Sequence, residues 1–370
     1  THCPGDRTLP LGFVVVTHFD LAVPQVPSTG CVAPMASGTA DSVLLLDGGM
    51  GHLLKSQDIA RFAPDLPVER QFAAAALANA AAPDLIVGLH EVYIAAGCHV
   101  ITSNTFGCTS WSLSRAGAAE RTAELAAAGA MLARRAADAA PRPVVVAGSL
   151  PPLGPSYLPP AADRSHAQLE EYATLAHAMA PAVDVLLCET MSSADEAAVA
   201  ASAAAATGKP VWISWTLQDA SDGEPRLRSG ESLQAAWDRV KDIPCLQAIL
   251  INCSSPGTVG AAVPCLRRLA PAGVRVGGYA NGFRQTTGEW LEGRGKADIN
   301  DAGDYDEVGD LLPGAYAAHA ASWVRAGAGI VGGCCGVGPA HIESVSALLQ
   351  REGGALEYNS CSAERRVPPP

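Results

Sequence analysis

The feature that most constrains the fold is an alternation that recurs from Ser42 almost to the end of the chain. Each unit is a short run rich in valine, isoleucine and leucine, followed by a polar or glycine-bearing break and a long alanine-rich stretch. Short runs of this kind favour strands, and strands that alternate with helices are typical of parallel sheets. The eight predicted strands are Val43–Leu46, Cys98–Thr102, Val144–Ala147, Val183–Cys188, Val211–Trp215, Leu246–Ile251, Val274–Gly278 and Ala328–Val331.

The alanine-rich stretches between these runs predict helices. They are Val68–Ala82, a second helix that begins at Pro83-Asp84, Ala116–Ala140, Ser165–Met179, Ser193–Ala206, Ser232–Val240, Gly257–Leu269, Tyr316–Ala326 and Ala340–Arg351. Eight strands with helices between them favour a closed barrel over a doubly wound sheet, which usually has fewer strands. We therefore predict an α/β fold of the (β/α)8 TIM-barrel type over residues 41–352.

The barrel is expected to carry a short flank on each side. At 370 residues the chain is longer than a usual single domain, but α/β barrels reach such lengths as one domain. Residues 1–40 are rich in Pro, Gly, Ser and Thr, and we predict a poorly ordered N-terminal extension there. Its Cys3 and Cys31 receive no role. Residues 353–370 are predicted to form a C-terminal tail.

Composition and charge narrow the class of partner. Hydrophobic residues make up 48% and charged residues 17% of a chain with a formal net charge of −12. Nucleic-acid binding would require a clustered basic face, so we expect none. Apolar runs fall short of the roughly 18 residues that a membrane helix needs. The run Leu11–Val16 is also too short for the core of a signal peptide. We expect small-molecule substrates and no membrane partner.

The chain has 11 cysteines, which do not form a dense, regular framework. Small secreted domains stapled by disulfides show such frameworks. We therefore expect a reducing, cytoplasmic location in which most of the cysteines are thiols.

Polar residues follow the predicted strands at the points where they end. In barrel enzymes the catalytic groups lie at the C-terminal ends of the strands, so these residues should meet at one rim. They include Asp47-Gly48 after strand one, Thr102-Ser103 after strand two, Glu189-Thr190 after strand four, Asn252-Cys253 after strand six and Cys334-Cys335 after strand eight.

Three cysteines at this rim are candidate metal ligands. Cys334 and Cys335 are adjacent and flanked by glycines, which permit the sharp bend that two neighbouring ligands need. Cys253 would supply a third thiolate, because strands six and eight are separated by only one strand. Three thiolates would leave the fourth position of a zinc ion open, which is typical of catalytic zinc. The alternatives are buried cysteines that act as small hydrophobes, a vicinal disulfide or a redox switch.

The other rim residues indicate an amino-acid substrate. Asp47 and Glu189 are suited to hold an ammonium group. Glycines such as Gly48 and the turn at Ser103 are expected to expose backbone N–H groups suited to a carboxylate. The alternatives are a helix N-cap for Asp47 and a structural ion pair for Glu189. With an amino-acid cradle beside an open zinc position, the fourth ligand is predicted to be a substrate sulfur, held as a nucleophilic thiolate.

Together these motifs resemble the zinc-dependent homocysteine S-methyltransferases. The resemblance runs from about Val43 to Leu349. It is carried by Leu46-Asp47-Gly48-Gly49-Met50-Gly51, Thr102-Ser103-Asn104-Thr105-Phe106, Gly148-Ser149-Leu150-Pro151-Pro152, Glu189-Thr190, Asn252-Cys253, Tyr279-Ala280-Asn281 and Gly332-Gly333-Cys334-Cys335-Gly336.

The resemblance implies a zinc enzyme of methionine biosynthesis. Cys253, Cys334 and Cys335 would bind Zn²⁺ and activate the homocysteine thiol. Asp47 and Glu189 would hold its ammonium group, backbone near Gly48 together with Ser103 would receive its carboxylate, and Asn252 would support the site. Ala280 departs from the proline that the family generally has there.

The resemblance also bears on the methyl donor. In the betaine-using branch an aromatic residue follows Thr-Phe of strand two and a long C-terminal arm supports oligomers, whereas Gly107 follows Phe106 here and only about twenty residues follow the last helix. Cobalamin-dependent methionine synthases need further domains, for which the chain has no room. We therefore expect S-methylmethionine or S-adenosylmethionine as donor, and a monomer or dimer.

Several alternatives stay open. The same chemistry could act on another small thiol or selenol, such as selenocysteine, or use betaine. A barrel aldolase or hydrolase would need a catalytic lysine or histidine at a strand end, and none is convincing. A non-catalytic zinc or redox-sensing barrel would need a fourth protein ligand. The polar loop Gln218–Gly230 and the acidic insertion Gly282–Pro313 are either functional or solvated, and a role for the insertion in covering the substrate is one possibility.

Overall fold

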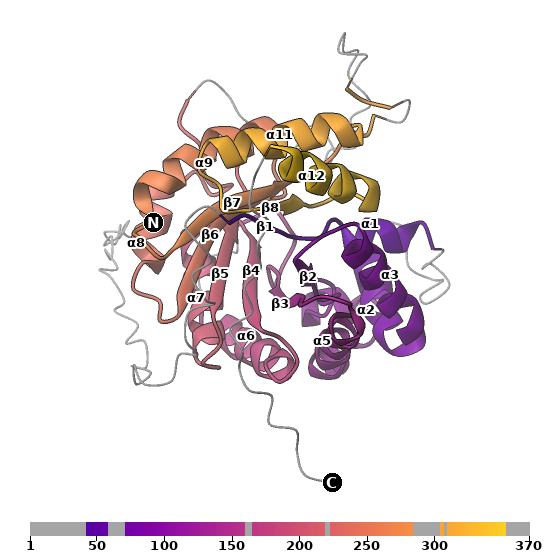
Figure 1. Ribbon diagram of the computed structural model, residues 1–370. Coiled ribbons are helices and arrows are strands. Elements are labelled where there is room, and N and C mark those ends of the chain that lie inside the picture. The colour runs from indigo at the N-terminus through magenta and orange to yellow at the C-terminus, as the bar shows by residue number, and fades with distance from the viewer. Residues whose placement is uncertain are drawn as a thin grey trace, which may run out of the picture.

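The computed structural model describes residues 42–57, 71–159, 165–218, 223–283, 304–306 and 309–352. The predicted N-terminal extension and C-terminal tail, and most of the acidic insertion, lie outside these ranges. Within them, eight strands alternate with helices, and the strands form one parallel sheet surrounded by helices (Figure 1). The α/β barrel predicted from the sequence is confirmed.

All eight predicted strands are present. They are β1 (Leu44–Leu45), β2 (Val100–Thr102), β3 (Val145–Leu150), β4 (Val185–Met191), β5 (Val211–Trp215), β6 (Leu246–Asn252), β7 (Arg275–Ala280) and β8 (Ile330–Gly333). The sheet order is β1-β8-β7-β6-β5-β4-β3-β2, so each strand lies beside its neighbour in sequence and β8 returns to β1.

The barrel closes between β1 and β2 by a narrow seam. An isolated parallel bridge joins Leu46 to Val100. On either side of it, the Asp47 N–H donates to the Val100 carbonyl at 3.0 Å and the His99 N–H donates to the Leu45 carbonyl at 2.7 Å. Because β1 has only two residues and β2 three, this ladder is much shorter than those between the central strands.

The helices follow the predicted stretches, with differences at their ends. They are α1 (Met50–Lys55), α2 (Gln71–Ala81), α3 (Pro83–Ala95), α4 (Ser110–Ser114), α5 (Thr122–Ala139), α6 (Ser165–Met179), α7 (Ala194–Ala205), α8 (Leu233–Val240), α9 (Pro256–Leu269), α11 (Pro313–Arg325) and α12 (Pro339–Arg351). The short helices α1 and α4 were not predicted, because five or six residues carry too little periodicity. The helix predicted from Ala116 begins only at Thr122, since Gly117 has a positive φ of 66° and breaks it.

Two layers of apolar side chains hold the barrel together. One fills its interior and includes Leu46, Ala147, Leu187 and Trp212 from different strands. The other lies between the sheet and the helices, where alternate residues such as Leu45 point outward. This two-sided burial explains why the strands appear in the sequence as continuous apolar runs rather than as alternating patterns.

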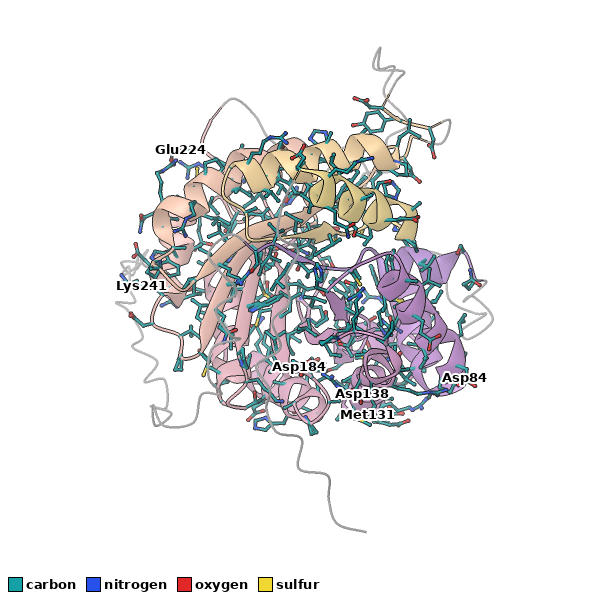
Figure 2. All side chains as sticks on the ribbon, in the orientation of Figure 1. Asp84, Met131, Asp138, Asp184, Glu224 and Lys241 are labelled. Carbon is teal, nitrogen blue, oxygen red and sulfur yellow. The ribbon has the colours of Figure 1, made fainter. Side chains whose placement is uncertain are left out.

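Charged side chains lie on the outer surface. Asp84 on α3 and Asp138 on α5 are labelled near the lower right edge of the molecule in Figure 2, and Asp184 directly precedes β4. Asp84 pairs with Arg135, and Arg134 pairs with both Asp138 and Asp184. Among the described helices, none alone is long and apolar enough to cross a membrane. Only α2 and α3 together, bent by 109° between Ala81 and Pro83, meet that test of length and composition.

Candidate metal centre and amino-acid site

The three predicted cysteines meet at one point. Cys253 follows β6, and Cys334 and Cys335 follow β8, with β7 paired between the two strands. Their sulfur atoms all lie within 4.8 Å of one another, and the sulfurs of Cys253 and Cys334 are 2.6 Å apart. Within the described ranges, no other group of three or more Cys, His, Asp or Glu side chains gathers in this way.

The backbone around these cysteines is held in unusual conformations. Cys253 has a positive φ of 47°, and Gly336, directly after Cys335, has a φ of 77°. The turn is tied down because the Cys334 N–H donates to the Ala280 carbonyl at 2.8 Å and the Gly282 N–H donates to the Cys335 carbonyl at 2.7 Å. The bend that the flanking glycines were expected to allow is therefore present.

The electrostatics of the trio favour a cation. Contacts with Cys253 and Cys335, followed by burial, raise the pKa of the Cys334 thiol well above its usual value. Such thiols ionise together only when a positive charge lies among them, and thiolates are strong ligands for zinc and other soft metals. The donor set and its spacing thus fit a metal ion.

Asp47 lies at the end of β1, buried with 2% of its surface exposed. Both of its carboxylate oxygens accept hydrogen bonds from Thr102, at 2.7 Å from the backbone N–H and 3.0 Å from the hydroxyl. Burial, opposed by these bonds, raises its pKa to about 8. The N-cap of α1 is Gly49, without a side-chain hydrogen bond, so Asp47 does not cap this helix.

Glu189, near the end of β4, is the second buried carboxylate. It accepts hydrogen bonds from the Ser149 hydroxyl at 2.5 Å and the Tyr279 hydroxyl at 3.1 Å. Burial raises its pKa to about 7, although both hydrogen bonds act in the opposite direction. No arginine or lysine of the described residues forms a salt bridge with it. Among the described residues, therefore, the Glu189 carboxylate has hydroxyl partners but no cationic one, and a ligand's ammonium group would complement it.

Gly48 and Ser103, which were predicted to receive a carboxylate, differ in whether their backbone N–H groups already have an acceptor. Within the described part of the chain, no acceptor lies in hydrogen-bond reach of the Gly48 N–H. A Cβ at this position would lie 2.2 Å from the Val337 carbonyl, so only glycine fits. Ser103 does not expose its N–H as expected, because that group donates to the Ala147 carbonyl at 2.9 Å. Its hydroxyl shares a hydrogen bond with Thr105 and accepts one from the Ser149 N–H.

Asn252, the last residue of β6, connects the two halves of the site. Its Oδ1 accepts hydrogen bonds from the Thr190 N–H at 2.9 Å and the Ser214 hydroxyl at 2.8 Å. Its Nδ2 donates to the Thr190 hydroxyl at 2.8 Å and lies 3.9 Å from the Cys334 sulfur. Asn252 therefore contacts both the strand that carries Glu189 and a candidate metal ligand.

Tyr157 is a residue of this rim that sequence patterns did not reveal. It lies in the loop after β3, and burial, followed by its proximity to Cys253, Cys335 and Cys334, raises the pKa of its hydroxyl well above the usual value. Its φ of 70° is positive, and the guanidinium carbon of Arg228, from the predicted polar loop after β5, lies 5.5 Å from the ring centroid. Strand periodicity gives no signal for a tyrosine in an irregular loop.

Ala280 shows how the chain accommodates its departure from the proline that the resemblance implies. The Ala280 N–H, which proline would lack, donates to the Tyr316 hydroxyl at 3.1 Å. That hydroxyl in turn donates to the Gly332 carbonyl at 2.6 Å, directly below the cysteine turn. Tyr316 on α11 therefore supports both β7 and β8 where they reach the site.

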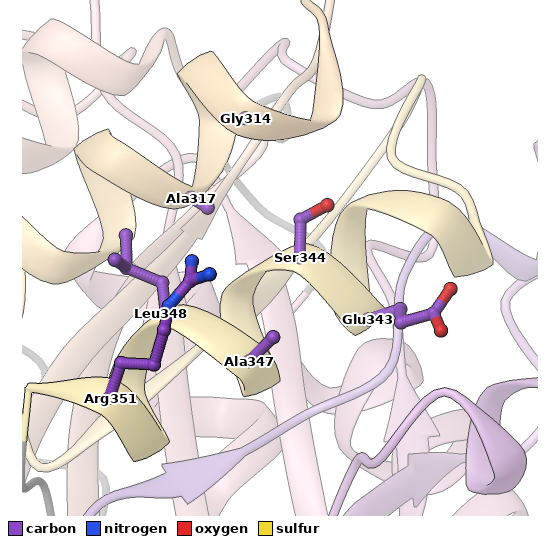
Figure 3. Close-up of a pocket in the computed structure, with 7 residues that line it drawn as sticks. All are labelled: Gly314, Ala317, Glu343, Ser344, Ala347, Leu348 and Arg351. Atoms are coloured by element: carbon purple, nitrogen blue, oxygen red, sulfur yellow. The ribbon is translucent and has the colours of Figure 1, made fainter.

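A surface hollow lies elsewhere, between α11 and α12 (Figure 3). It is lined by Gly314, Ala317, Glu343, Ser344, Ala347, Leu348 and Arg351. It contains none of the predicted site residues. The described ends of the acidic insertion, in contrast, adjoin the cysteine turn, because the Gly282 N–H donates to the Cys335 carbonyl and the Leu311 N–H donates to the carbonyl of Gly282.

Comparisons with known proteins place the chain in one family. Residues 44–349 match a family model described as homocysteine S-methyltransferase. The homocysteine S-methyltransferase of Escherichia coli K12 is 28% identical over 326 residues, which cover 82% of this chain and 94% of that protein. The methionine synthase of Mycobacterium tuberculosis H37Rv is 28% identical over 324 residues, covering 83% of this chain but only 24% of that protein.

Solved structures show the same fold. The crystal structure of the homocysteine methyltransferase MmuM from E. coli in its metallated form has a TM-score of 0.64 at 23% identity. The alignment covers 83% of this chain and 96% of that one. An oxidized form of the same protein gives the same values.

Proposed function

The chain belongs to the homocysteine S-methyltransferase family of methyl-transferring enzymes, and from that premise we propose that it moves a methyl group from a sulfonium donor to homocysteine in a zinc-dependent reaction. One observation carries the proposal: three neighbouring thiols lie at the same barrel rim as two buried carboxylates. The first group suits a sulfur-bound metal and the second suits the ammonium group of an amino acid. Homocysteine has both a thiol and an ammonium group.

Cys253, Cys334 and Cys335 would hold the zinc ion. When bound, zinc supplies positive charge that keeps a coordinated thiol in its nucleophilic thiolate form near neutral pH. The amide of Asn252 lies 3.9 Å from the Cys334 sulfur and would orient it, and the Tyr157 hydroxyl lies near the three sulfurs. Partners of this kind commonly tune metal ligands.

The amino-acid end of homocysteine would lie against the carboxylates. Asp47 and Glu189 would hold its ammonium group, each kept in place by two hydrogen bonds from neighbouring strands. The N–H of Gly48 would bind its carboxylate, and the Ser103 hydroxyl would take part beside it. Because these groups are buried, they exclude water and strengthen the electrostatic contacts.

The transfer itself is a direct displacement. The homocysteine thiol releases its proton to solvent on binding, and its sulfur then forms a new bond to the donor methyl carbon. The bond between that carbon and the positively charged donor sulfur breaks, and its electron pair stays on the donor, which leaves as a neutral thioether. The products are methionine and the demethylated donor.

The structure supports a sulfonium donor over betaine at one position. A Cβ at Gly107 would lie 2.0 Å from the Phe72 carbonyl oxygen, so the aromatic residue that the betaine-using branch has after Thr-Phe does not fit here. S-methylmethionine is the donor that we propose, with S-adenosylmethionine as a poorer substitute.

The experiment that tests this function crosses donors with acceptors. Purified enzyme loaded with zinc is given S-methylmethionine, S-adenosylmethionine or betaine, together with homocysteine, selenocysteine or cysteine, and the methylated product is measured. We expect the fastest turnover with S-methylmethionine and homocysteine. Preference for betaine, or metal-free enzyme of full activity, would contradict the proposal.

Two further predictions concern the whole protein. We propose that it works in the cytoplasm as a monomer or dimer. Free thiols at Cys98, Cys108, Cys188 and Cys265 are compatible with a reducing compartment, whereas Cys245 is disulfide-bonded and is the described cysteine that does not fit this proposal. Light scattering after gel filtration measures the oligomeric state, and a trimer or larger assembly would contradict the second prediction.

A further inference from the structure

Thr190, directly after Glu189, has a conformation that needs support. Its φ is 61°, a region that β-branched residues adopt only under constraint. Asn252 provides that constraint with two hydrogen bonds, one from the Thr190 N–H at 2.9 Å and one to the Thr190 hydroxyl at 2.8 Å. Thr190, Asn252 and Ser214 are all fully buried, and the Ser214 hydroxyl donates a further hydrogen bond to Asn252 at 2.8 Å.

This strained residue sets the direction of Glu189. The Glu189 carboxylate is fixed from two further strands, by the Ser149 hydroxyl of β3 and the Tyr279 hydroxyl of β7. Tyr279 is the direct register partner of Asn252 across the β6–β7 ladder. The backbone and the side chain of Glu189 are therefore both held in a frame that includes Asn252.

The same asparagine also faces the sulfur end of the site. Its Nδ2 lies 3.9 Å from the Cys334 sulfur, within reach of an N–H···S hydrogen bond. One side chain therefore connects the carboxylate that would hold an ammonium group with a sulfur that would hold the metal. The separation of these two anchor points is fixed by buried hydrogen bonds rather than by a flexible loop.

We propose that Asn252 and Thr190 form a rigid spacer, which selects aminothiols by their length. The proposal rests on the function proposed above, in which the ammonium group and the sulfur of one substrate are held at these two ends. Homocysteine has one methylene group more than cysteine between them. With both anchors fixed, cysteine reaches only one of them, and it loses either the metal or Glu189.

The expected selectivity exceeds what a simple apolar pocket achieves. One methylene in such a pocket discriminates by roughly 10–200-fold. Two fixed polar anchors should reach the upper end of that range or more, since the shorter substrate leaves one buried polar partner unpaired. Loosening the spacer should lower the preference for homocysteine over cysteine, mainly by weakening the binding and turnover of homocysteine.

The test compares Asn252→Ala and Thr190→Gly with a matched control, Asn79→Ala. Asn79 is another buried asparagine, whose Nδ2 donates to the carbonyls of Asn104 and Leu125 and whose Oδ1 accepts from Asn104. It joins α2 to its neighbours and takes no part in the spacer. Binding of homocysteine and of cysteine to each zinc-loaded variant is measured by titration calorimetry without any donor, alongside kcat/KM with the donor.

We expect Asn252→Ala to reduce the homocysteine-to-cysteine ratio at least about tenfold, in both binding and kcat/KM. Thr190→Gly removes the strain and one hydrogen bond but keeps the N–H contact, so it should reduce the ratio by less. Asn79→Ala should lower the unfolding temperature and leave the ratio unchanged. An unchanged homocysteine-to-cysteine ratio in Asn252→Ala, or an equal fall of that ratio in Asn79→Ala, would overturn the proposal.

The readouts keep the two proposals separate. If wild-type enzyme binds homocysteine tightly and rejects cysteine but transfers no methyl group from any sulfonium, the proposed function fails and the spacer stands. If it methylates homocysteine and cysteine equally well, the function stands and the spacer fails. Should Asn252→Ala not fold, Thr190→Gly gives the deciding ratio.

Discussion

The two ends of the barrel use buried polar groups in opposite ways. At the N-terminal ends of the strands, cationic side chains donate to backbone carbonyls. Arg275 contacts the carbonyl of Ser42 at 3.0 Å, and the ammonium group of Lys209 contacts that of Val183 at 2.7 Å. At the C-terminal rim, two buried carboxylates lie beside one buried and two half-buried thiols, and no lysine or arginine of the described residues forms a salt bridge with either carboxylate.

Backbone conformation differs in the same direction. Four non-glycine residues of the described chain have a positive φ, and three of them, Tyr157, Thr190 and Cys253, lie at the C-terminal rim. Strain and uncompensated burial both reduce stability, and they persist where function requires them. The comparison teaches that one end of the barrel stabilises the fold, whereas the other holds charge and strain ready for a ligand.

Replacing a metal ligand at the C-terminal rim should cause the largest loss of activity. Cys334→Ser removes one of the three sulfurs that would hold zinc, so we expect zinc content well below one ion per chain and a loss of kcat/KM of roughly 1,000-fold or more, since even indirect partners of a metal cost 10–100-fold. Elemental analysis and methionine formation measure both. Full activity at normal zinc content would contradict the site.

Removing a rim carboxylate should give the next largest effect. Glu189→Gln keeps the shape of the side chain but removes the charge that would hold the substrate ammonium, so KM for homocysteine should rise by roughly 10–100-fold, with a smaller change in kcat. Initial-rate kinetics at several homocysteine concentrations separate the two constants. A change in kcat alone would assign Glu189 to another step.

The same variant tests whether the charge lowers stability. Burial raises the pKa of Glu189 from its ordinary value of 4.5 to about 7. Its protonated form therefore favours the folded state, a contribution that is complete below about pH 4.5 and lost as pH rises through about 7. Glutamine does not ionise, so Glu189→Gln has no such pH-dependent loss. The unfolding temperature of the variant should therefore rise relative to that of the wild type as pH increases from 5 to 8.5. A constant difference in unfolding temperature across this pH range would argue against destabilisation by the ionised Glu189 carboxylate.

A substitution at the opposite end should show the reverse pattern. Arg275→Met removes the contacts with the Ser42 and Gly329 carbonyls. The Gly329 carbonyl keeps its hydrogen bond from the Leu44 N–H, whereas the carbonyl of the buried residue Ser42 loses its arginine partner. We expect a loss of about 1–3 kcal/mol in the free energy of unfolding and no change in kcat/KM. Urea unfolding and steady-state kinetics on one preparation test both. A large kinetic defect would show that the two ends are not separate in function.

The smallest effect is expected at Tyr157. Tyr157→Phe keeps the ring and removes only the hydroxyl, which lies near the sulfur of Cys253, so kcat/KM should fall by about two- to fivefold, the size of one weak polar contact, with little change in stability. Parallel measurements of zinc affinity show whether the hydroxyl acts through the metal. An increase in activity would mean that the hydroxyl competes with the substrate.

The sequence predicted the two ends unequally well. Strand positions, the meeting of Cys253 with Cys334 and Cys335, and the rim position of Asp47 and Glu189 follow from one periodic pattern, because a barrel brings strand ends together whatever their separation in sequence. The strain at Thr190 and the position of Tyr157 depend on single torsion angles, which no periodicity records. The N–H of Ser103 was expected to be exposed, but the paired strand β3 supplies its acceptor, the Ala147 carbonyl.

The seam between β1 and β2 affects how the rim can respond to a ligand. Asp47 lies at the end of this seam, where a single bridge and its flanking bonds join the strands, whereas Glu189 belongs to a strand with long ladders on both sides. Local opening should therefore begin next to Asp47, and amide hydrogens of β1 should exchange with solvent faster than those of β4. A substrate that bridges Asp47 and Glu189 would hold the two strands together and slow amide exchange along the seam. Its binding could therefore be followed by hydrogen exchange there, without measuring methyl transfer.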